Sequence, residues 1–302
     1  MNDFLKEAKE LQEELTSNRR YLHANAETGF DLPKTVAFVM EKLTSYGYTP
    51  IPMGGGIVCT CGIPGKTLMI RADMDALPID EASGAAFSSE HPGRMHACGH
   101  DGHMAMALAA ATWVDRVARG ADAVVRAGQL PRNILFVFQP AEETTGGAKR
   151  VCESGVFERY RVARIFGMHL WPDLPAGSLA SRPGPLLARS SETTITFHGV
   201  SSHIAKWRDG RDALGAAARF VVGSKWLSRK LEQDEPFLLR FGHMTAGTVR
   251  NAVAGQARVE GSLRVFSDDM FARAQDEVRA LALPMRRGAP STSTFRRGIH
   301  PW

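Results

Sequence analysis

The chain has 302 residues, of which 44% are hydrophobic and 23% are charged, and its formal net charge is +5. This length and apolar content are enough for a large buried core and for two domains. No stretch approaches the roughly 20 apolar residues of a membrane span, and no block of Lys and Arg interleaved with aromatic residues predicts a nucleic-acid surface. Since the N-terminus reads as a charged amphipathic helix rather than a signal peptide, we expect a cytoplasmic protein with no membrane or nucleic-acid partner.

The first part of the chain alternates helical and strand-like segments. Apolar periodicity predicts helices near residues 3–23, 34–46 and 101–118. Short β-rich apolar runs predict strands near residues 57–62, 67–73, 133–139 and 164–168. This alternation predicts an α/β sheet domain, with residues 119–132 as a surface connection. Asp101 is a good N-cap for the third helix, whose positive end would then lie near the residues just before it.

The pattern changes after residues 182–185, which read Arg-Pro-Gly-Pro. The rest of the chain predicts a strand, a helix, two strands and a helix, at residues 191–198, 211–230, 237–244, 256–266 and 268–282. This order of elements predicts a separate α+β module.

The segment from His96 to His103 carries one thiol and three imidazoles. Cys98 and His100 stand one residue apart, so both can point at one cation from an extended loop. Thiolate plus imidazole suits borderline metals such as Zn²⁺, Mn²⁺ or Co²⁺. A match this short also arises by chance, in which case Cys98 would be a buried thiol among surface histidines.

Two adjacent acids, Glu142 and Glu143, follow the strand predicted over residues 133–139. One of them can ligate a metal ion while its neighbour, pointing the other way, takes a proton from metal-bound water. A solvated turn is the alternative for this pair taken alone. His169 stands in the same place after the strand near 164–168, and open α/β sheets bind their ligands at that edge.

Asp73 and Asp75 form a fourth group of this kind. They alternate with apolar residues at the end of the strand over residues 67–73, and therefore face the same side. Either carboxylate can ligate a metal or hold a ligand His by a hydrogen bond. Four segments, far apart in the sequence, thus each place acids or imidazoles at the end of an apolar run, which predicts one shared metal site.

Five segments carry motifs in a fixed order: Arg20–His23 with Glu27–Phe30, Arg71–Ile79, Met95–Asp101, Phe138–Glu143 and Gly167–His169. Together they resemble the aminoacylase, hippurate hydrolase and IAA-amino acid hydrolase group of metallo-amidohydrolases, over residues 15–283. The resemblance implies a zinc-exopeptidase-like catalytic sheet domain over residues 1–182. It also implies an inserted α+β lid and dimerisation domain over residues 183–290, and hence a homodimer.

By this resemblance, the metal ligands of a binuclear site are Cys98, His100, Glu143 and His169. Glu142 is then the general base, and the cofactors are two divalent cations, Mn, Zn, Co or Ni. The implied reaction is hydrolysis of the amide bond of an N-acyl amino acid or a related small amide. No G-x-S-x-G motif is present, so a serine hydrolase is not favoured.

The predicted lid carries three further candidates. His203, in Gly199–His203, matches a family His that polarises the scissile carbonyl, although a surface loop His is the alternative. Asn251 and Arg264 resemble lid positions that hold the substrate carboxylate, for which Arg suits by its bidentate geometry. Strand Arg residues are also often only solvated.

The end of the chain departs from the family. Residues 284–302 are neither periodic nor apolar, and are not predicted to form a fold element. With codons chosen from the degenerate code, Ser291–Trp302 in another frame reads Asp-Val-His-Phe-Ser-Glu-Gly-Tyr-Pro-Pro-Val, which resembles the last lid strand of the family. We therefore expect a frameshift near residues 283–290, an aberrant tail over 291–302 and a C-terminally truncated catalytic domain.

Such a truncation would remove the fifth ligand of the family, a His near the C-terminus for which His300 is a poor match. Exposed apolar surface and low stability would result. Two alternatives to the deacylase therefore stay open. One is an inactive relative whose lid only dimerises, and the other is a metallo-dipeptidase.

Overall fold

The computed structural model describes residues 4–61, 65–119, 133–143, 146–282 and 291–297. The chain divides into two compact units, Met1–Ser178 and Leu179–Trp302. Their assignment as catalytic domain and dimerising lid stays a prediction at this point. No helix among the described residues is long and apolar enough to cross a membrane.

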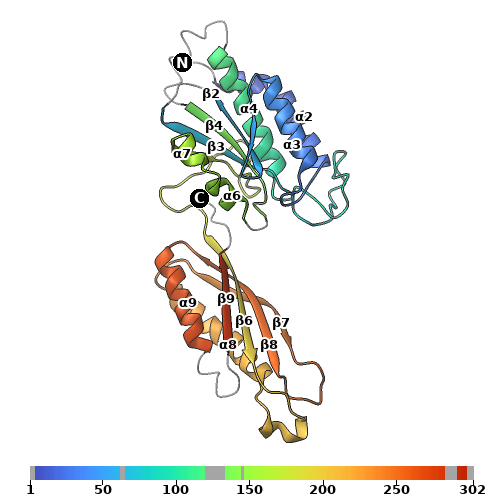
Figure 1. The fold of residues 1–302 in the computed structure, drawn as a ribbon, viewed down its shortest axis with the longest axis vertical. Coiled ribbons are helices and arrows are strands. Elements are labelled where there is room, and N and C mark those ends of the chain that lie inside the picture. Colours follow the sequence, from blue (N-terminus) through green and yellow to red (C-terminus); the bar gives the residue numbers. More distant parts are fainter. Residues whose placement is uncertain (1–3, 62–64, 120–132, 144–145, 283–290, 298–302) are drawn as a thin grey trace. The chain divides into compact units, whose positions relative to one another are not determined.

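The first unit is built around a five-stranded sheet with the order β1-β2-β4-β3-β5 (Figure 1). Its strands are β1 (Ile51–Met53), β2 (Gly56–Cys61), β3 (Thr67–Asp73), β4 (Asn133–Gln139) and β5 (Val162–Gly167). Strands β3, β4 and β5 are parallel, whereas β1 and β2 are antiparallel to their neighbours. Because Asp73 pairs with Gln139, β3 and β4 end at the same edge of the sheet.

Helices cover both faces of this sheet. They are α1 (Phe4–Glu10), α2 (Gln12–Ala24), α3 (Pro33–Ser45), α4 (His100–Arg119), α6 (Gly147–Glu153) and α7 (Val156–Arg159). Strand β4 shows how the sequence builds the layers, since successive strand residues point to opposite faces. Phe136 and Phe138 are buried in the core shared with α2, α3 and α4, whereas Leu135 and Val137 are buried in the core shared with α6 and α7.

The predicted strands of this unit are confirmed, but two details of its helices are not as expected. The helix predicted over residues 3–23 is two helices, because a turn interrupts it at Leu11. Asp101 is not the N-cap of α4: the first helical hydrogen bonds of Gly102 and His103 are accepted by the Gly99 carbonyl. The Asp101 carboxylate instead contacts α2. Residues 120–132, most of the predicted connection, lie outside the described residues.

The second unit is a four-stranded antiparallel sheet with the order β7-β8-β6-β9 (Figure 1). Its elements are β6 (Arg189–His198), η1 (Ile204–Asp209), α8 (Ala213–Leu231), β7 (Leu238–Ala246), β8 (Gln256–Val265), α9 (Asp268–Ala282) and β9 (Ser291–Arg297). Both α-helices pack on one face of the sheet, around Phe197, Phe220 and Val259, which are fully buried. The predicted α+β module is confirmed.

Strand β9 corrects the expectation for the tail. Ser291–Arg297 was not predicted to form an element, yet it pairs with β6, from Phe197 opposite Ser291 to Ser191 opposite Arg297. A sheet edge offers unpaired backbone groups to any extended segment, and Thr292 and Thr294 are β-branched residues that favour that conformation. Residues 284–290 and 298–302 lie outside the described residues, and the frameshift stays a prediction that sequencing the gene would test.

Candidate metal centre

The ends of β3 and β4 are joined by one carboxylate. Asp75 follows β3, and its two oxygens accept hydrogen bonds from the backbone N–H groups of Glu142, at 2.8 Å, and Glu143, at 3.1 Å. Asp75 is 1% exposed, so these bonds lie in the protein interior. The two adjacent acids after β4 are therefore held beside the end of β3.

His100 begins α4 and completes this edge. Its Nδ1 lies 2.7 Å from the Asp75 carbonyl oxygen, which can only accept, so Nδ1 carries the proton and Nε2 presents its lone pair. Nε2 lies 3.7 Å from a Glu143 oxygen and 3.9 Å from a Glu142 oxygen. Within the described part of the chain, His100 Nε2 and Glu143 Oε1 are buried without a hydrogen-bond partner. Orphaned lone pairs of this kind fit a bound cation.

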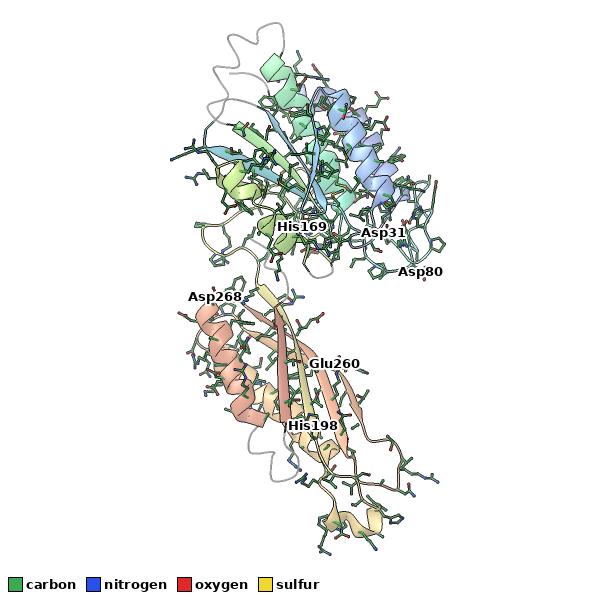
Figure 2. The ribbon with its side chains drawn as sticks, in the orientation of Figure 1. Asp31, Asp80, His169, His198, Glu260 and Asp268 are labelled. Atoms are coloured by element: carbon green, nitrogen blue, oxygen red, sulfur yellow. The ribbon has the colours of Figure 1, made fainter. Side chains whose placement is uncertain are left out.

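Cys98 and His169 meet the same group from two other segments. Their Sγ and Nε2 atoms lie 3.4 Å apart, and His169 follows β5 at the edge of the first unit (Figure 2). Cys98, His100 and His169 can each offer one ligand atom within 4.8 Å of the others, and so can His100, Glu142 and Glu143. The structure thus brings together all four predicted ligands and the predicted base. Thiolate, imidazole and carboxylate together suit a borderline divalent metal.

Burial is the main cause of the raised pKa values in this site. Burial, followed by the hydrogen bond with Glu143 and the charge of Glu143, raises the pKa of the Cys98 thiol to about 12. Burial and the nearby Asp73 raise the pKa of Glu142, and burial raises that of Asp75. A divalent cation would stabilise the thiolate and the carboxylates together.

Asp73 lies beside these groups, held by Arg71 and His103. Burial opposes its ionised form, but the neighbouring His103 ring and the Arg71 guanidinium outweigh burial and lower its pKa. The Arg71 Nη2 lies 2.5 Å from one Asp73 oxygen, and His103 Nδ1 lies 3.6 Å from the other. Asp73 is therefore held as a carboxylate beside the cluster.

His103 is the residue that the sequence reasoning did not assign. Asp73, His100 and His103 form a third group of possible metal ligands, and the His103 ring centroid lies 4.6 Å from that of His169. The Leu170 N–H donates to His103 Nε2 at 3.3 Å, which ties α4 to the segment after β5. The signal was present in the sequence, because residues three apart on a helix share a face.

The three candidates of the second unit lie in exposed positions. His203 Nδ1 accepts a hydrogen bond from the Ala205 N–H, and the Ile204 N–H donates to the Asn251 carbonyl at 2.9 Å, so His203 and Asn251 are neighbours. Arg264 pairs with Ser190 at the far end of β8. At about 3.3 Å per strand residue, Arg264 lies roughly 25 Å along β8 from Gln256, where the strand begins after the loop that holds Asn251. One copy of the second unit therefore cannot bring Asn251 and Arg264 to one carboxylate.

Comparison with known proteins agrees with this geometry. Residues 69–294 match the model of Peptidase family M20/M25/M40. The chain belongs to this family. It is 36% identical over 269 residues to an N-acetyldiaminopimelate deacetylase of Exiguobacterium sibiricum, covering 86% of the chain and 69% of that relative. A Listeria monocytogenes protein of the same name is 35% identical over 276 residues, covering 89% of the chain and 71% of the relative.

Two solved structures resemble the chain over nearly all of its length. A putative aminohydrolase from methicillin resistant Staphylococcus aureus has a TM-score of 0.89 and 28% identity, covering 99% of the chain and 79% of that protein. A Bacillus subtilis dinuclear metal binding peptidase from the M20 family has a TM-score of 0.80 and 30% identity, covering 96% and 75%. The chain is a metal-dependent amide hydrolase with a catalytic domain and a lid. Its clusters of potential ligand side chains are consistent with binding of divalent metal ions.

Proposed function

We propose that this chain deacylates N-acyl amino acids, with Glu142 as the general base and two divalent cations, Mn, Zn, Co or Ni, as cofactors. The proposed ligands are Cys98, His100, Glu143 and His169. One observation carries the proposal: side chains from separate segments meet at a single sheet edge, where His100 Nε2 and Glu143 Oε1 are buried without partners among the described residues.

Bound cations would supply Lewis acidity, which polarises the amide carbonyl and makes water more acidic. Glu142 takes the proton from the attacking water and later donates it to the leaving amine. Its raised pKa suits both steps, because a general base works best when its pKa lies near the working pH. Its side chain is 26% exposed, so it lies against His100 on one side and is open to water and substrate on the other.

Asp75 orients the groups that act in these steps. Its carboxylate fixes the backbone of Glu142 and Glu143, and its carbonyl fixes the His100 tautomer. Asp73 adds a permanent negative charge beside the cluster and raises the pKa of Glu142. Both acids thus support the reaction without being the base.

From the second unit, we propose that His203 polarises the amide carbonyl and that Asn251 and Arg264 bind the substrate carboxylate. A hydrogen-bond donor aimed at the developing oxyanion stabilises the transition state. The lid is also proposed to form the homodimer. Since Arg264 lies far from Asn251 along β8, the two residues would act at different carboxylates or from different subunits.

The substrate class follows from the relatives that are named N-acetyldiaminopimelate deacetylase. We propose N-acetylated amino acids, with N-acetyldiaminopimelate as the first member to test. The chain's modest positive charge of +5 suits an anionic substrate.

The test is hydrolysis of N-acetyldiaminopimelate and a panel of N-acetyl and N-benzoyl amino acids by the purified chain. Separate assays contain Mn²⁺, Zn²⁺, Co²⁺ or Ni²⁺, and a further assay contains a chelator instead of metal. The Glu142→Gln variant is the blank under each condition. Metal-dependent release of the free amino acid, absent from the blank, supports the proposal. A folded chain that binds metal but releases nothing would contradict it and favour an inactive relative, and preference for dipeptides would favour a metallo-dipeptidase.

A further inference from the structure

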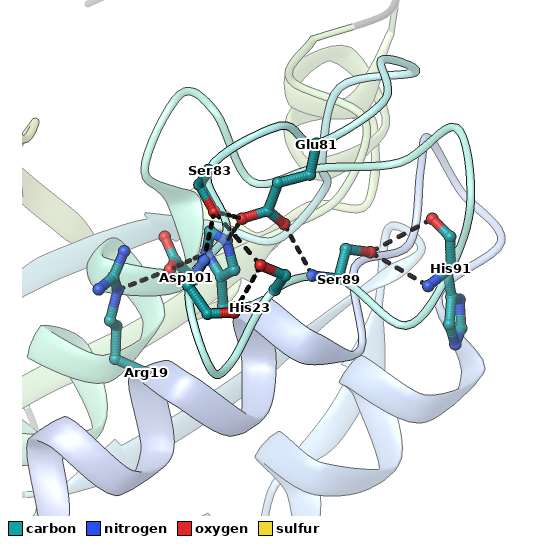
Figure 3. Close-up of polar contacts among 9 residues, drawn as sticks. Arg19, His23, Glu81, Ser83, Ser89, His91 and Asp101 are labelled. Carbon is teal, nitrogen blue, oxygen red and sulfur yellow. Dashed lines mark hydrogen bonds and ion pairs between the residues drawn. The ribbon is translucent and has the colours of Figure 1, made fainter.

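A buried polar cluster lies beside the metal centre and has no part in the proposed chemistry. At its middle is His23 of α2, which is 4% exposed. His23 Nδ1 lies 2.8 Å from Asp101 Oδ2, and His23 Nε2 lies 3.2 Å from Glu81 Oε1 (Figure 3). The side chains of Asp101 and Glu81 are only 0% and 5% exposed. A single imidazole thus bridges two buried carboxylates.

This arrangement fixes the protonation state of the ring. An ionised carboxylate can only accept hydrogen bonds, so both ring nitrogens of His23 must donate, and the ring is an imidazolium. Other donors stabilise the ionised acids. Arg19 Nε donates to Asp101 at 2.8 Å, and the Ser89 N–H donates to Glu81 at 2.7 Å. The Ser83 hydroxyl also donates to Glu81 (Figure 3). Two cations face two anions, so the cluster is neutral overall.

The neighbouring groups agree with this assignment. The hydrogen bond to Asp101 raises the pKa of His23 in spite of burial, and the bonds from Ser83, Ser89 and His23 lower the pKa of Glu81 to about 2, again against burial. The His96 ring, whose centroid lies 6.3 Å from that of His23, is kept neutral because burial lowers its pKa to about 4. No competing cation therefore comes from that side.

Both acids belong to segments that frame the proposed ligands. Asp101 directly follows His100 in the first turn of α4. Glu81 lies in the loop between Asp75 and Cys98, and the base of this loop is closed by reciprocal backbone hydrogen bonds between Leu77 and Met95, each 3.0 Å. A shift of that turn or of that loop would therefore displace residues of the metal centre.

We propose that His23 is a positioning residue: by bridging Asp101 and Glu81, it holds the first turn of α4, and with it the His100 ring, against α2 and the loop of residues 79–95. The inference rests on the proposed role of His100 as a metal ligand. The Asp75 carbonyl fixes the His100 ring itself, whereas the His23 bridge fixes the helical turn that carries the ring.

Two amide variants separate the two arms of the bridge. In His23→Asn the amide nitrogen replaces Nδ1 and can still donate to Asp101, whereas in His23→Gln it replaces Nε2 and can donate only toward Glu81. Asn18→Leu is the control, because Asn18 is buried in the same helix but contacts Tyr46 of the neighbouring segment. Co²⁺ binding is measured by calorimetry. We expect His23→Gln to weaken it roughly 10- to 100-fold, His23→Asn less, and Asn18→Leu not at all.

NMR of the chain labelled with ¹⁵N in its histidines gives a readout that needs no metal. We expect both His23 ring nitrogens to be protonated at pH 6, and the His100 ring signals to shift in His23→Gln but not in Asn18→Leu. A neutral His23, or His100 signals and Co²⁺ affinity unchanged in His23→Gln, would overturn the inference. If the wild-type chain binds no Co²⁺, the proposed function fails, and the His100 shift alone then decides for or against the His23 bridge.

Discussion

The two units hold their candidate functional residues in opposite ways. In the first unit, side chains from distant segments converge on one sheet edge, and His100 at the centre is 1% exposed. In the second unit, His203, Asn251 and Arg264 are exposed, and β8 separates the last from the other two. Packing within the first unit therefore already builds a site, whereas the second unit offers side chains whose arrangement its own packing does not fix.

The largest effect is expected at the base of the first unit. Replacing Glu142 with Gln removes the proton acceptor but keeps the side-chain shape, so kcat should fall about 10²- to 10⁴-fold. Co²⁺ affinity should change little, because Glu142 is not a proposed ligand. Steady-state kinetics and calorimetry measure the two effects. Glu153→Gln, on an exposed stretch of α6, is the control, and equal losses in both variants would argue against Glu142 as the base.

A lid residue comes next. His203→Ala should lower kcat about 10²- to 10³-fold, because one donor to the developing oxyanion is lost. KM should move much less. His198→Ala is the matched control, since His198 is also an exposed His of the second unit (Figure 2). If both variants keep full activity, His203 is only a loop residue of the lid.

Replacing Asp75, which holds the backbone of Glu142 and Glu143 at the sheet edge, should have a smaller effect. Asp75→Asn replaces one of the two oxygens that accept from Glu142 and Glu143 with an amide that cannot accept. We expect cation affinity to fall roughly 10- to 100-fold. Calorimetric titration with Mn²⁺ measures it. Asp80→Asn, at an exposed acid that accepts from the Gly93 N–H, should bind like wild type. Unchanged affinity in Asp75→Asn would show that the edge does not need this anchor.

The buried bridge of the first unit predicts a dependence of stability on pH. Glu81 has a pKa lowered from 4.5 to about 2, so its contribution is present above pH 4.5 and is lost as the pH falls toward 2. His23 has a pKa raised above 6.5, so its contribution is present below pH 6.5 and is lost as the pH rises through the raised value. The urea concentration at the unfolding midpoint of the metal-free wild-type chain should therefore decrease as the pH falls below 4.5 and as it rises above 6.5. The same dependence of the midpoint on pH in His23→Gln would refute this prediction.

The smallest effect concerns geometry within the lid. Because His203 and Asn251 are neighbours and Arg264 is remote, a double-mutant cycle should give a coupling above about 0.5 kcal/mol for His203 with Asn251. The cycle of His203 with Arg264 should be additive within about the same limit. The measured quantity is kcat/KM of the single and double alanine variants. The reverse pattern would mean that Arg264, rather than Asn251, acts together with His203.

The sequence predicted most elements because their periodicity is strong. The apolar run of β4 faces two cores with successive residues, and the apolar residues after His100 pack inward as α4. Both elements could therefore be predicted without the structure. The candidate segments were noticed because each places acids or imidazoles next to an apolar run, and the family resemblance then implied which residues are the ligands and that Glu142 is the base. Convergence at one edge then results from the parallel pairing of β3 with β4 and β5.

Features that the sequence did not predict depended on tertiary partners. Asp101 has the chemistry of an N-cap, but Arg19 and His23, about 80 residues earlier in sequence, offer it stronger donors. Strand β9 forms because the edge of β6 is available to pair, which no local pattern reports. His103 was visible in its motif, yet only the positions of Asp73 and His169 around it show that it belongs to the cluster.

We expect the first unit to bind divalent cations through the thiolate of Cys98 together with His100, Glu143 and His169. Titration of the metal-free chain with Co²⁺, followed by absorption spectroscopy, tests it most directly, because a cobalt–thiolate bond gives a charge-transfer band. We predict that the band appears in the wild-type chain and is absent from Cys98→Ser, whereas Cys152→Ser, at an exposed cysteine, keeps it. Binding without the band, or a band that survives in Cys98→Ser, would contradict the assignment of the metal centre.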